Sequence, residues 1–241
     1  MIFNGLKPRK RNLFGQAVEE LGSRIVCGEL QPGQLLLESD VCRELGTSRT
    51  VVREALKSLS AKGLVDTRTR TGTRVLEATH WNLLDLDVLG WRYAAMPRIQ
   101  FFRELFELRR MIEPSAAALA AERATKADIE AIARAYADMQ SAPHESAAAI
   151  DADLRFHRAL LAAAHNELLA QMAGVIGAGL LTSFRISSSS FDVFVPQHGE
   201  VLEAIRYGRA PAARAAMEKL LVSTREFLER ELEEPASAAT Q

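Results

Sequence analysis

Cysteine is scarce in this sequence, and the sequence also lacks the features of membrane-spanning and secreted proteins. The 241 residues include only Cys27 and Cys42, which excludes a disulfide-rich scaffold. Both cysteines are expected to be small core-facing residues, with a redox switch between them as the alternative. No apolar run approaches the length of a membrane span, and the N-terminus lacks the basic-then-apolar order of a signal peptide. We therefore expect a cytoplasmic protein without structural disulfides.

Enzyme signatures are also missing, and the charge is unevenly divided. The sequence contains neither a phosphate-binding loop nor a dinucleotide fingerprint. A composition of 48% hydrophobic and 25% charged residues is ordinary for a globular chain, and 241 residues suffice for two domains. The net charge of −1 hides a net +4 in residues 1–78 and a net −5 in the remainder. Only the first part is therefore suited to face phosphates.

Residues 38–53 have the pattern of a helix-turn-helix. Apolar residues recur at about one helical turn up to Leu45, which predicts a first helix. Gly46 then permits a tight turn, and Ser48 can cap a second helix. This pair of helices is typical of DNA-binding domains.

The second helix carries polar residues that can reach DNA. Its predicted apolar face consists of Val52, Ala55, Leu56 and Leu59. On the opposite side, near the helix N-terminus, lie Arg49, Thr50 and Arg53. Arginine matches guanine O6 and N7 or phosphate oxygens, and the helix amides add a second phosphate-binding element. For any single arginine, the alternative is a solvated side chain without a DNA contact.

A basic hairpin is expected directly after this helix. Residues 64–77 form two short runs rich in Val, Thr and Arg, which meet around Gly72. The arginines that line the hairpin are Arg68, Arg70 and Arg74. Helix, turn, arginine-faced helix and basic hairpin in this order predict a winged helix-turn-helix that binds double-stranded DNA. A helix pair with an ordinary surface hairpin is the alternative.

The remainder of the chain is almost wholly helical in pattern, so the predicted fold is mainly α. The apolar segment 80–97, closed by Pro97, predicts a packed connecting helix. Six further helices are expected at residues 100–122, 126–140, 146–165, 167–186, 194–207 and 211–232. The predicted organisation is a DNA-binding domain at 1–78, a connecting segment at 79–99, an all-helical domain at 100–234 and a disordered tail at 235–241.

Over nearly its whole length the chain resembles the FadR subfamily of the GntR superfamily of bacterial transcription regulators. Similarity to the family's winged helix is carried by TSRTVVREALKSLSAKGLV and TGTRV. Similarity to its all-helical effector-binding domain is carried by ELRRMIEPSAAALAAERAT and DADLRFHRALLAAAHNELL. The segment HWNLLDLDVLGW resembles the hexonate-responsive branch, that of the galactonate-operon repressor. The resemblance implies a homodimeric regulator, more often a repressor, that leaves a palindromic operator when a sugar acid like D-galactonate binds.

Residues at the DNA interface follow from the same resemblance. It implies DNA contacts from Ser48, Arg49, Thr50, Arg53 and Gly72. Glycine at the tip of the wing lets backbone approach DNA closely. Arg68 and Arg70 are further candidates on the hairpin, whereas Ser39 stands where many relatives have an arginine. One contact made by relatives is therefore absent or replaced.

A second candidate site lies in the helical domain. Asp153 and His157 are four residues apart, on one helix face, a spacing suited to chelating a divalent ion such as Zn, Mn or Ni. The resemblance adds His198 as a third ligand and places Leu220 where many relatives have another histidine. Three ligands leave positions for water and an effector carboxylate or hydroxyl. Alternatively, the three residues hydrogen-bond an organic acid directly, or satisfy one another in the core.

An acidic effector needs a cation, and the resemblance points to Arg109. Its guanidinium suits a carboxylate bidentately, although Glu113 is also positioned as a plain ion-pair partner. Weaker candidates for the same effector site are Arg155, Asn166 and Arg185. Coupling between effector and DNA would pass through the apolar segment 80–97.

Two other function classes fit parts of the sequence. A metal-dependent hydrolase or lyase acting on small organic acids would use Asp and His around an ion to activate water. That reading leaves the DNA-binding pattern unexplained, and no further nucleophile or general base stands out. An architectural DNA-binding protein without a ligand leaves Asp153, His157 and His198 unexplained. We therefore expect a ligand-responsive regulator and not an enzyme.

Overall fold

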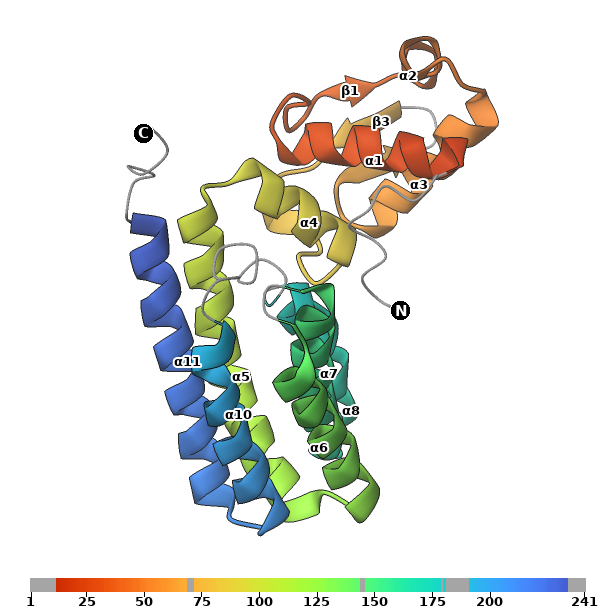
Figure 1. Cartoon of the computed structure of the whole chain (residues 1–241). Coiled ribbons are helices and arrows are strands. Elements are labelled where there is room, and N and C mark those ends of the chain that lie inside the picture. The colour runs from red at the N-terminus through yellow and green to blue at the C-terminus, as the bar shows by residue number, and fades with distance from the viewer. Residues whose placement is uncertain (1–11, 69–71, 144–145, 179, 181–190, 234–241) are drawn as a thin grey trace. The chain divides into compact units, whose positions relative to one another are not determined.

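The computed structural model describes residues 12–68, 72–143, 146–178, 180 and 191–233. Arg70, Arg185 and the predicted tail at 235–241 lie outside these residues. The chain divides into two compact units, Met1–Met96 and Pro97–Gln241, and each is described by itself. Helices dominate and one small sheet is present, so the predicted fold class is confirmed (Figure 1).

A helix-turn-helix forms the centre of the first unit. The motif consists of α2 (Glu38–Leu45) and α3 (Arg49–Ala61), and α1 (Leu13–Val26) packs against α3. Helix α2 ends at Gly46, whose φ of 59° lies in the left-handed region that glycine adopts at little cost. The Ser48 hydroxyl then accepts a hydrogen bond from the Val51 amide and caps α3. Both the turn and the cap therefore form at the residues expected.

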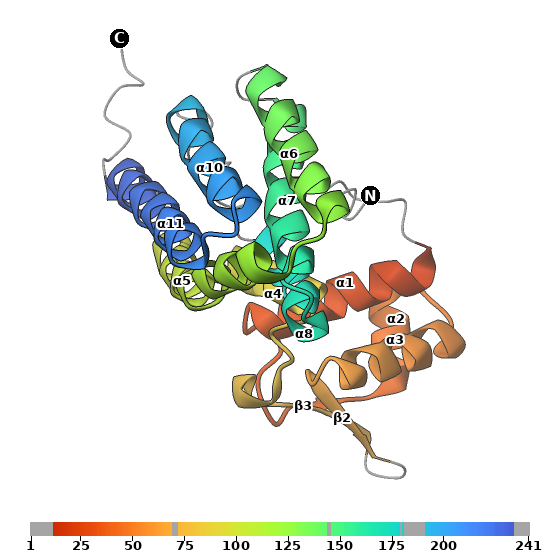
Figure 2. The same ribbon diagram turned by 90° about the horizontal axis from the view of Figure 1, so that it is seen from below.

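A three-stranded antiparallel sheet completes the winged helix (Figure 2). Its strands are β1 (Leu35–Leu36), β2 (Val65–Arg68) and β3 (Gly72–Val75), in the order β1-β3-β2. Arg68 pairs with Gly72 in the register of β2 and β3. Gly72 has a φ of 85°, and a Cβ at this position would lie 2.8 Å from Cδ1 of Leu35. The backbone conformation of the wing therefore favours glycine at this position, independently of any contact with DNA.

The apolar segment after the wing belongs to the first unit. It contains a short turn η1 (Ala78–His80) and helix α4 (Leu86–Ala95). Helix α4 packs on α1, and a Cβ at Gly22 would lie 2.3 Å from the ring of Trp91. The helix expected over 80–97 begins later, because the Asp85 carboxylate accepts the amides of Asp87 and Val88 and starts α4 there.

The second unit is a helical bundle. Its helices are α5 (Arg98–Arg123), α6 (Lys126–Ser141), α7 (Ala147–Ala163), α8 (Glu167–Gln171), α10 (Phe191–Arg206) and α11 (Ala210–Glu233). Helix α5 packs against α10 and α11, while α6 pairs with α7, as Figure 2 shows. The largest apolar side chains in the core between them include Phe102, Phe106, Phe156, Leu160 and Leu161. No helix in the described ranges is long and apolar enough to cross a membrane.

Five of the six helices expected in this region occur with bounds within three residues of the prediction. The helix expected over 167–186 is interrupted, since α8 ends at Gln171 and residues 173–178 are helical again. The break falls at Met172, and Gly174 and Gly177 lie within the helical residues that follow it. Residues 181–186 lie outside the described part of the chain.

Candidate functional site

A group of charged and imidazole side chains is buried in the core of the second unit. Its members are Arg109 and Glu113 on α5, Asp153 and His157 on α7, and His198 on α10. Each is at most 8% exposed. Burying charge is costly unless the groups pair with one another or hold an ion. The three residues predicted as metal ligands therefore meet, and two further residues join them.

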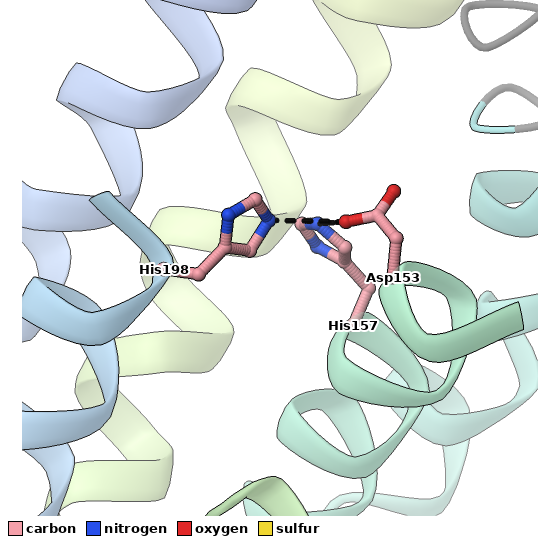
Figure 3. A group of neighbouring side chains, drawn as sticks. All are labelled: Asp153, His157 and His198. Carbon is pink, nitrogen blue, oxygen red and sulfur yellow. Dashed lines mark ion pairs between the residues drawn. The ribbon is translucent and has the colours of Figure 1, made fainter. Parts of the chain in front are cut away.

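Both imidazoles turn the same nitrogen toward one carboxylate oxygen (Figure 3). His198 Nε2 lies 3.0 Å and His157 Nε2 3.5 Å from Oδ1 of Asp153. Buried His198 Nε2 nevertheless has no hydrogen-bond partner, so its approach to Asp153 is close but not aligned for a hydrogen bond. The three ligand atoms lie within 4.8 Å of one another. A point between them is therefore within reach of all three.

The opposite nitrogen of each imidazole is held by an acceptor. His198 Nδ1 lies 2.8 Å from the carbonyl oxygen of Phe194, and His157 Nδ1 contacts Oε2 of Glu113. Since a carbonyl oxygen and a carboxylate can only accept, each Nδ1 carries the proton. The neutral tautomer then has its lone pair on Nε2, directed at the shared point. Histidines that bind metals are commonly oriented in this way.

The electrostatics of the group are dominated by its carboxylates. Burial alone would lower the pKa of His157, but the charge of Glu113 and hydrogen bonds to Asp153 and Glu113 outweigh it and raise the pKa to about 9. For Asp153, burial opposes ionisation, yet the nearby imidazoles of His157 and His198 hold its pKa well below the ordinary value. A cation near Asp153 is therefore favoured, whether a proton on His157 or a metal ion.

Arg109 and Glu113 extend the group along α5. Arg109 Nε lies 2.5 Å from Oε1 of Glu113, and the guanidinium carbon lies 4.8 Å from the ring centroid of Phe106. Burial raises the pKa of Glu113, but the charges of Arg109 and His157 outweigh it and lower the pKa to about 2. Nη1 of Arg109 is buried without a hydrogen-bond partner. An acceptor from a bound molecule would satisfy it.

The donor set of one carboxylate and two imidazoles suits Zn, Mn or Ni. The orphaned Nε2 of His198 is the observation that favours an ion over mutual satisfaction, because a lone pair facing a carboxylate is otherwise uncompensated. Leu220 is 2% exposed in the apolar core and has no ligand atom to offer. A bound ion would therefore keep positions for water or an effector.

The structure does not bring Asn166 or Arg155, two of the weaker effector candidates, into this group. Asn166 is exposed, and its side-chain oxygen caps α8 by accepting the amides of Leu168 and Leu169. Arg155 is 44% exposed and pairs with Asp138 at 2.7 Å and Asp151 at 2.8 Å. Both residues thus have local structural roles, which their types alone did not reveal.

Glu113 is the residue whose role was underestimated from the sequence. Its spacing of four from Arg109 correctly indicated an ion pair on one helix face. The contact with His157, however, spans 44 residues and depends on how α5 and α7 pack. Only the tertiary structure shows that Glu113 orients a candidate ligand.

The residues expected to contact DNA lie at the N-terminal end of α3 and on the wing. Arg49 and Thr50 are exposed in the first turn of α3, and Ser48 precedes them as the cap. Arg53, one turn further, is 61% exposed and pairs with Glu38 of α2. On the wing, Gly72 opens β3 and the backbone of Arg68 closes β2. The Arg68 side chain and Arg70 lie outside the described part of the chain.

Each of the two units contains a segment that matches a known protein family. The family described as "Bacterial regulatory proteins, gntR family" matches residues 13–75, and the FCD domain family matches residues 104–223. The galactonate operon transcriptional repressor of Escherichia coli K12 is 34% identical over 224 residues, covering 90% of this chain and 98% of that protein. The HTH-type transcriptional regulator LutR of Bacillus subtilis 168 is 31% identical over 218 residues, covering 86% and 97%.

Solved structures support the fold over the same length. Streptococcus agalactiae GntR covers 89% of this chain and 99% of its own, with a TM-score of 0.52 and 24% sequence identity. At this identity the likeness concerns the fold alone, whereas the family follows from the sequence relatives and the two matched domains. The chain therefore belongs to the GntR family of bacterial regulatory proteins, as a DNA-binding transcription regulator with an FCD domain and not as an enzyme.

Proposed function

We propose that the protein represses an operon for the catabolism of a sugar acid, a hexonate like D-galactonate, and leaves its operator when that acid binds. The observation that carries the proposal is the buried group in the FCD domain. There, the Nε2 atoms of two imidazoles and a carboxylate oxygen converge beside an arginine with an unused donor. A relative with 34% identity is a galactonate operon repressor, which supports the hexonate class.

In this proposal Asp153, His157 and His198 would hold one divalent ion, and Arg109 would pair with the effector carboxylate. Bound there, the ion supplies Lewis acidity for the effector's carboxylate or hydroxyl oxygens. Glu113 orients His157 and balances the charge of Arg109. A sugar acid offers both a carboxylate and neighbouring hydroxyls, whereas a neutral sugar lacks the charge that Arg109 would recognise.

The DNA side of the proposal uses the winged helix. Ser48, Arg49, Thr50 and Arg53 would contact one half-site, and Gly72, with Arg68 and Arg70 beside it, would approach the neighbouring groove or backbone. The protein would act as a homodimer, since two identical winged helices require a palindromic operator with matched half-sites.

The test is calorimetric titration of the purified full chain with D-galactonate, with glucose as a matched control that lacks the carboxylate. Fluorescence anisotropy on a labelled duplex from upstream of its own gene then reports DNA release at fixed salt. We expect galactonate to bind and release the DNA, and glucose to do neither. DNA binding that ignores galactonate but responds to another carboxylate would reject the hexonate assignment and keep the effector site.

A further inference from the structure

Arg53, a proposed DNA contact, is held by a carboxylate from the preceding helix. Its Nε lies 3.2 Å from Glu38 Oε1 and its Nη2 lies 3.0 Å from Glu38 Oε2, so both oxygens are engaged side by side. Glu38 is the first residue of α2, and Arg53 lies in the second turn of α3. Glu38 therefore fixes the plane of the guanidinium from across the turn of the helix-turn-helix.

The pair leaves one edge of Arg53 available. A guanidinium has five N–H donors, and Glu38 takes the edge formed by Nε and Nη2. The remaining edge, formed by Nη1 and the second N–H of Nη2, presents two parallel donors. That arrangement matches O6 and N7 of guanine in the major groove. Because the side chain is 61% exposed, solvent and ligands can approach it.

Glu38 also changes the balance between phosphate attraction and base recognition. A neutralised arginine attracts phosphates less than a lone one, since non-specific DNA affinity depends on the positive charges that displace counterions. The hydrogen-bond directions of the remaining edge are unaffected. The hydrogen bond from Arg53 is the main reason that the pKa of Glu38 lies below its ordinary value, so the carboxylate is ionised at neutral pH.

The pair contributes little to holding α2 and α3 together. Apolar side chains do that, since Val41 of α2 is 4% exposed and Val52 of α3 is fully buried in the same core. An ion pair whose members are 61% and 37% exposed is screened by solvent and adds little to stability. A bidentate geometry at the N-terminal end of α3 therefore fits a role in recognition better than a role in folding.

We propose that Glu38 is a specificity-determining residue of the DNA interface, which positions Arg53 so that its open edge reads one guanine in each half-site. Glu38 itself touches no base and acts through Arg53. The inference rests on the proposed function, in which Arg53 contacts DNA. Fixing the guanidinium before binding also reduces the side-chain entropy lost in the complex.

The test compares Glu38→Gln with Asp40→Asn. Each substitution removes one negative charge from α2, but Asp40 pairs with Arg43 of its own helix at 3.2 Å. The probe is the duplex that wild-type protein selects from a randomised pool. Anisotropy at fixed salt then measures binding to this duplex, to versions with each guanine replaced, and to an unrelated duplex. Melting temperatures check that each variant is folded.

We expect Glu38→Gln to reduce discrimination at one guanine of a half-site by about 5- to 150-fold, with equal or higher affinity for the unrelated duplex. Asp40→Asn should retain the discrimination. Arg53→Ala should lose the preference for the same guanine, and adding Glu38→Gln to it should change nothing further.

Unchanged discrimination in Glu38→Gln, or an equal loss in Asp40→Asn, would overturn the inference. If Arg53→Ala loses the guanine preference and Glu38→Gln retains it, the DNA interface stands and only the role of Glu38 fails. If Arg53→Ala selects the same sequence as wild type, Arg53 is not a base contact and the inference fails, while DNA recognition by the rest of the winged helix stands. If wild-type protein selects no sequence, the operator recognition in the proposed function fails as well.

Discussion

Glu113 links the arginine proposed for the effector to a proposed metal ligand. One carboxylate oxygen meets Arg109 and the other meets Nδ1 of His157, and the side chain is fully buried. Glu113 therefore keeps the Nδ1 proton in place and leaves Nε2 of His157 directed at Asp153. Partners of this kind commonly change metal affinity by about 10- to 100-fold.

Glu113→Gln should weaken metal binding by about 10- to 100-fold, because a neutral amide holds the Nδ1 proton less strongly. Competition with a chelating dye on folded protein measures the affinity. Glu107→Gln removes the same charge from an exposed position of α5 and should leave the affinity at its wild-type value. Equal affinities in Glu113→Gln and wild type would show that Glu113 serves only to neutralise Arg109.

Leu220→His tests whether the site lacks a fourth ligand. The resemblance to the family aligns Leu220 with a histidine ligand, and the side chain is 2% exposed. We expect metal affinity to rise on the order of tenfold or more, about 1.4 kcal/mol. Leu221→His places an imidazole at the next core position and should only destabilise the bundle. Weaker or unchanged metal binding in Leu220→His would place that residue away from the ion.

At the scale of residues, the sequence predicted part of this site. Asp153 and His157 could be paired from helix periodicity, and His198 entered through the resemblance to the family. Glu113 and the cap at Asn166 could not be assigned, since one depends on the packing of α5 on α7 and the other on where α8 begins. A sequence pattern predicts tertiary contacts and the first residue of a helix less reliably than it predicts the helix itself.

Among the elements, α6 begins with a reciprocal cap that contains a titratable carboxylate. Asp128 Oδ2 accepts the Thr125 amide at 2.8 Å and the Thr125 hydroxyl at 2.7 Å, and also contacts His165 Nε2 at 2.9 Å. Hydrogen bonds from Thr125 are the main reason that the pKa of Asp128 lies below its ordinary value of 3.8.

The stability that the Asp128 carboxylate contributes should be present above pH 3.8 and lost as the pH falls through its lower folded pKa. The difference in unfolding free energy between wild type and Asp128→Asn should therefore close in acid. Chemical unfolding at a series of pH values measures it. Glu130→Gln, exposed on the same helix, serves as the control. A difference that persists unchanged below the folded pKa would mean that the charge is irrelevant to the cap.

Helix α4 was predicted as a helix, but its packing against α1 within the first unit was not. Its apolar residues suggested a connector that couples two domains, but Trp91 is 4% exposed and contacts Gly22 of α1. The absence of a side chain at Gly22 makes room for the indole ring. This complementarity between distant residues has no signature in a single sequence.

Trp91→Ala should therefore destabilise the first unit by about 3–5 kcal/mol, as expected for a buried aromatic side chain replaced by alanine. The melting temperature and the affinity for DNA should both fall. Leu84→Ala, at a 58% exposed position just before α4, should cost little. If Trp91→Ala leaves stability intact and alters only the response to ligand, the indole is a coupling element and not part of the core.

At the scale of the whole molecule, the DNA-binding segment and the FCD domain lie in different units, so regulation requires that effector binding in one unit changes DNA binding by the other. The GntR family segment lies in the first unit and the FCD segment in the second, with the boundary at Met96 and Pro97. An effector can weaken DNA binding only by as much as it prefers the state that does not bind DNA. By the same linkage, operator DNA must weaken effector binding equally.

The most direct measurement is a titration with D-galactonate of the protein bound to a labelled DNA duplex from upstream of its own gene. Fluorescence anisotropy reports the bound DNA, in metal-loaded and chelator-stripped samples at equal salt. We expect DNA to be released at low galactonate concentration in the metal-loaded sample. After stripping, release should require a galactonate concentration at least about tenfold higher, since effector and ion would share one site. Identical titration curves in the two samples would contradict a metal-assisted effector site at Asp153, His157 and His198.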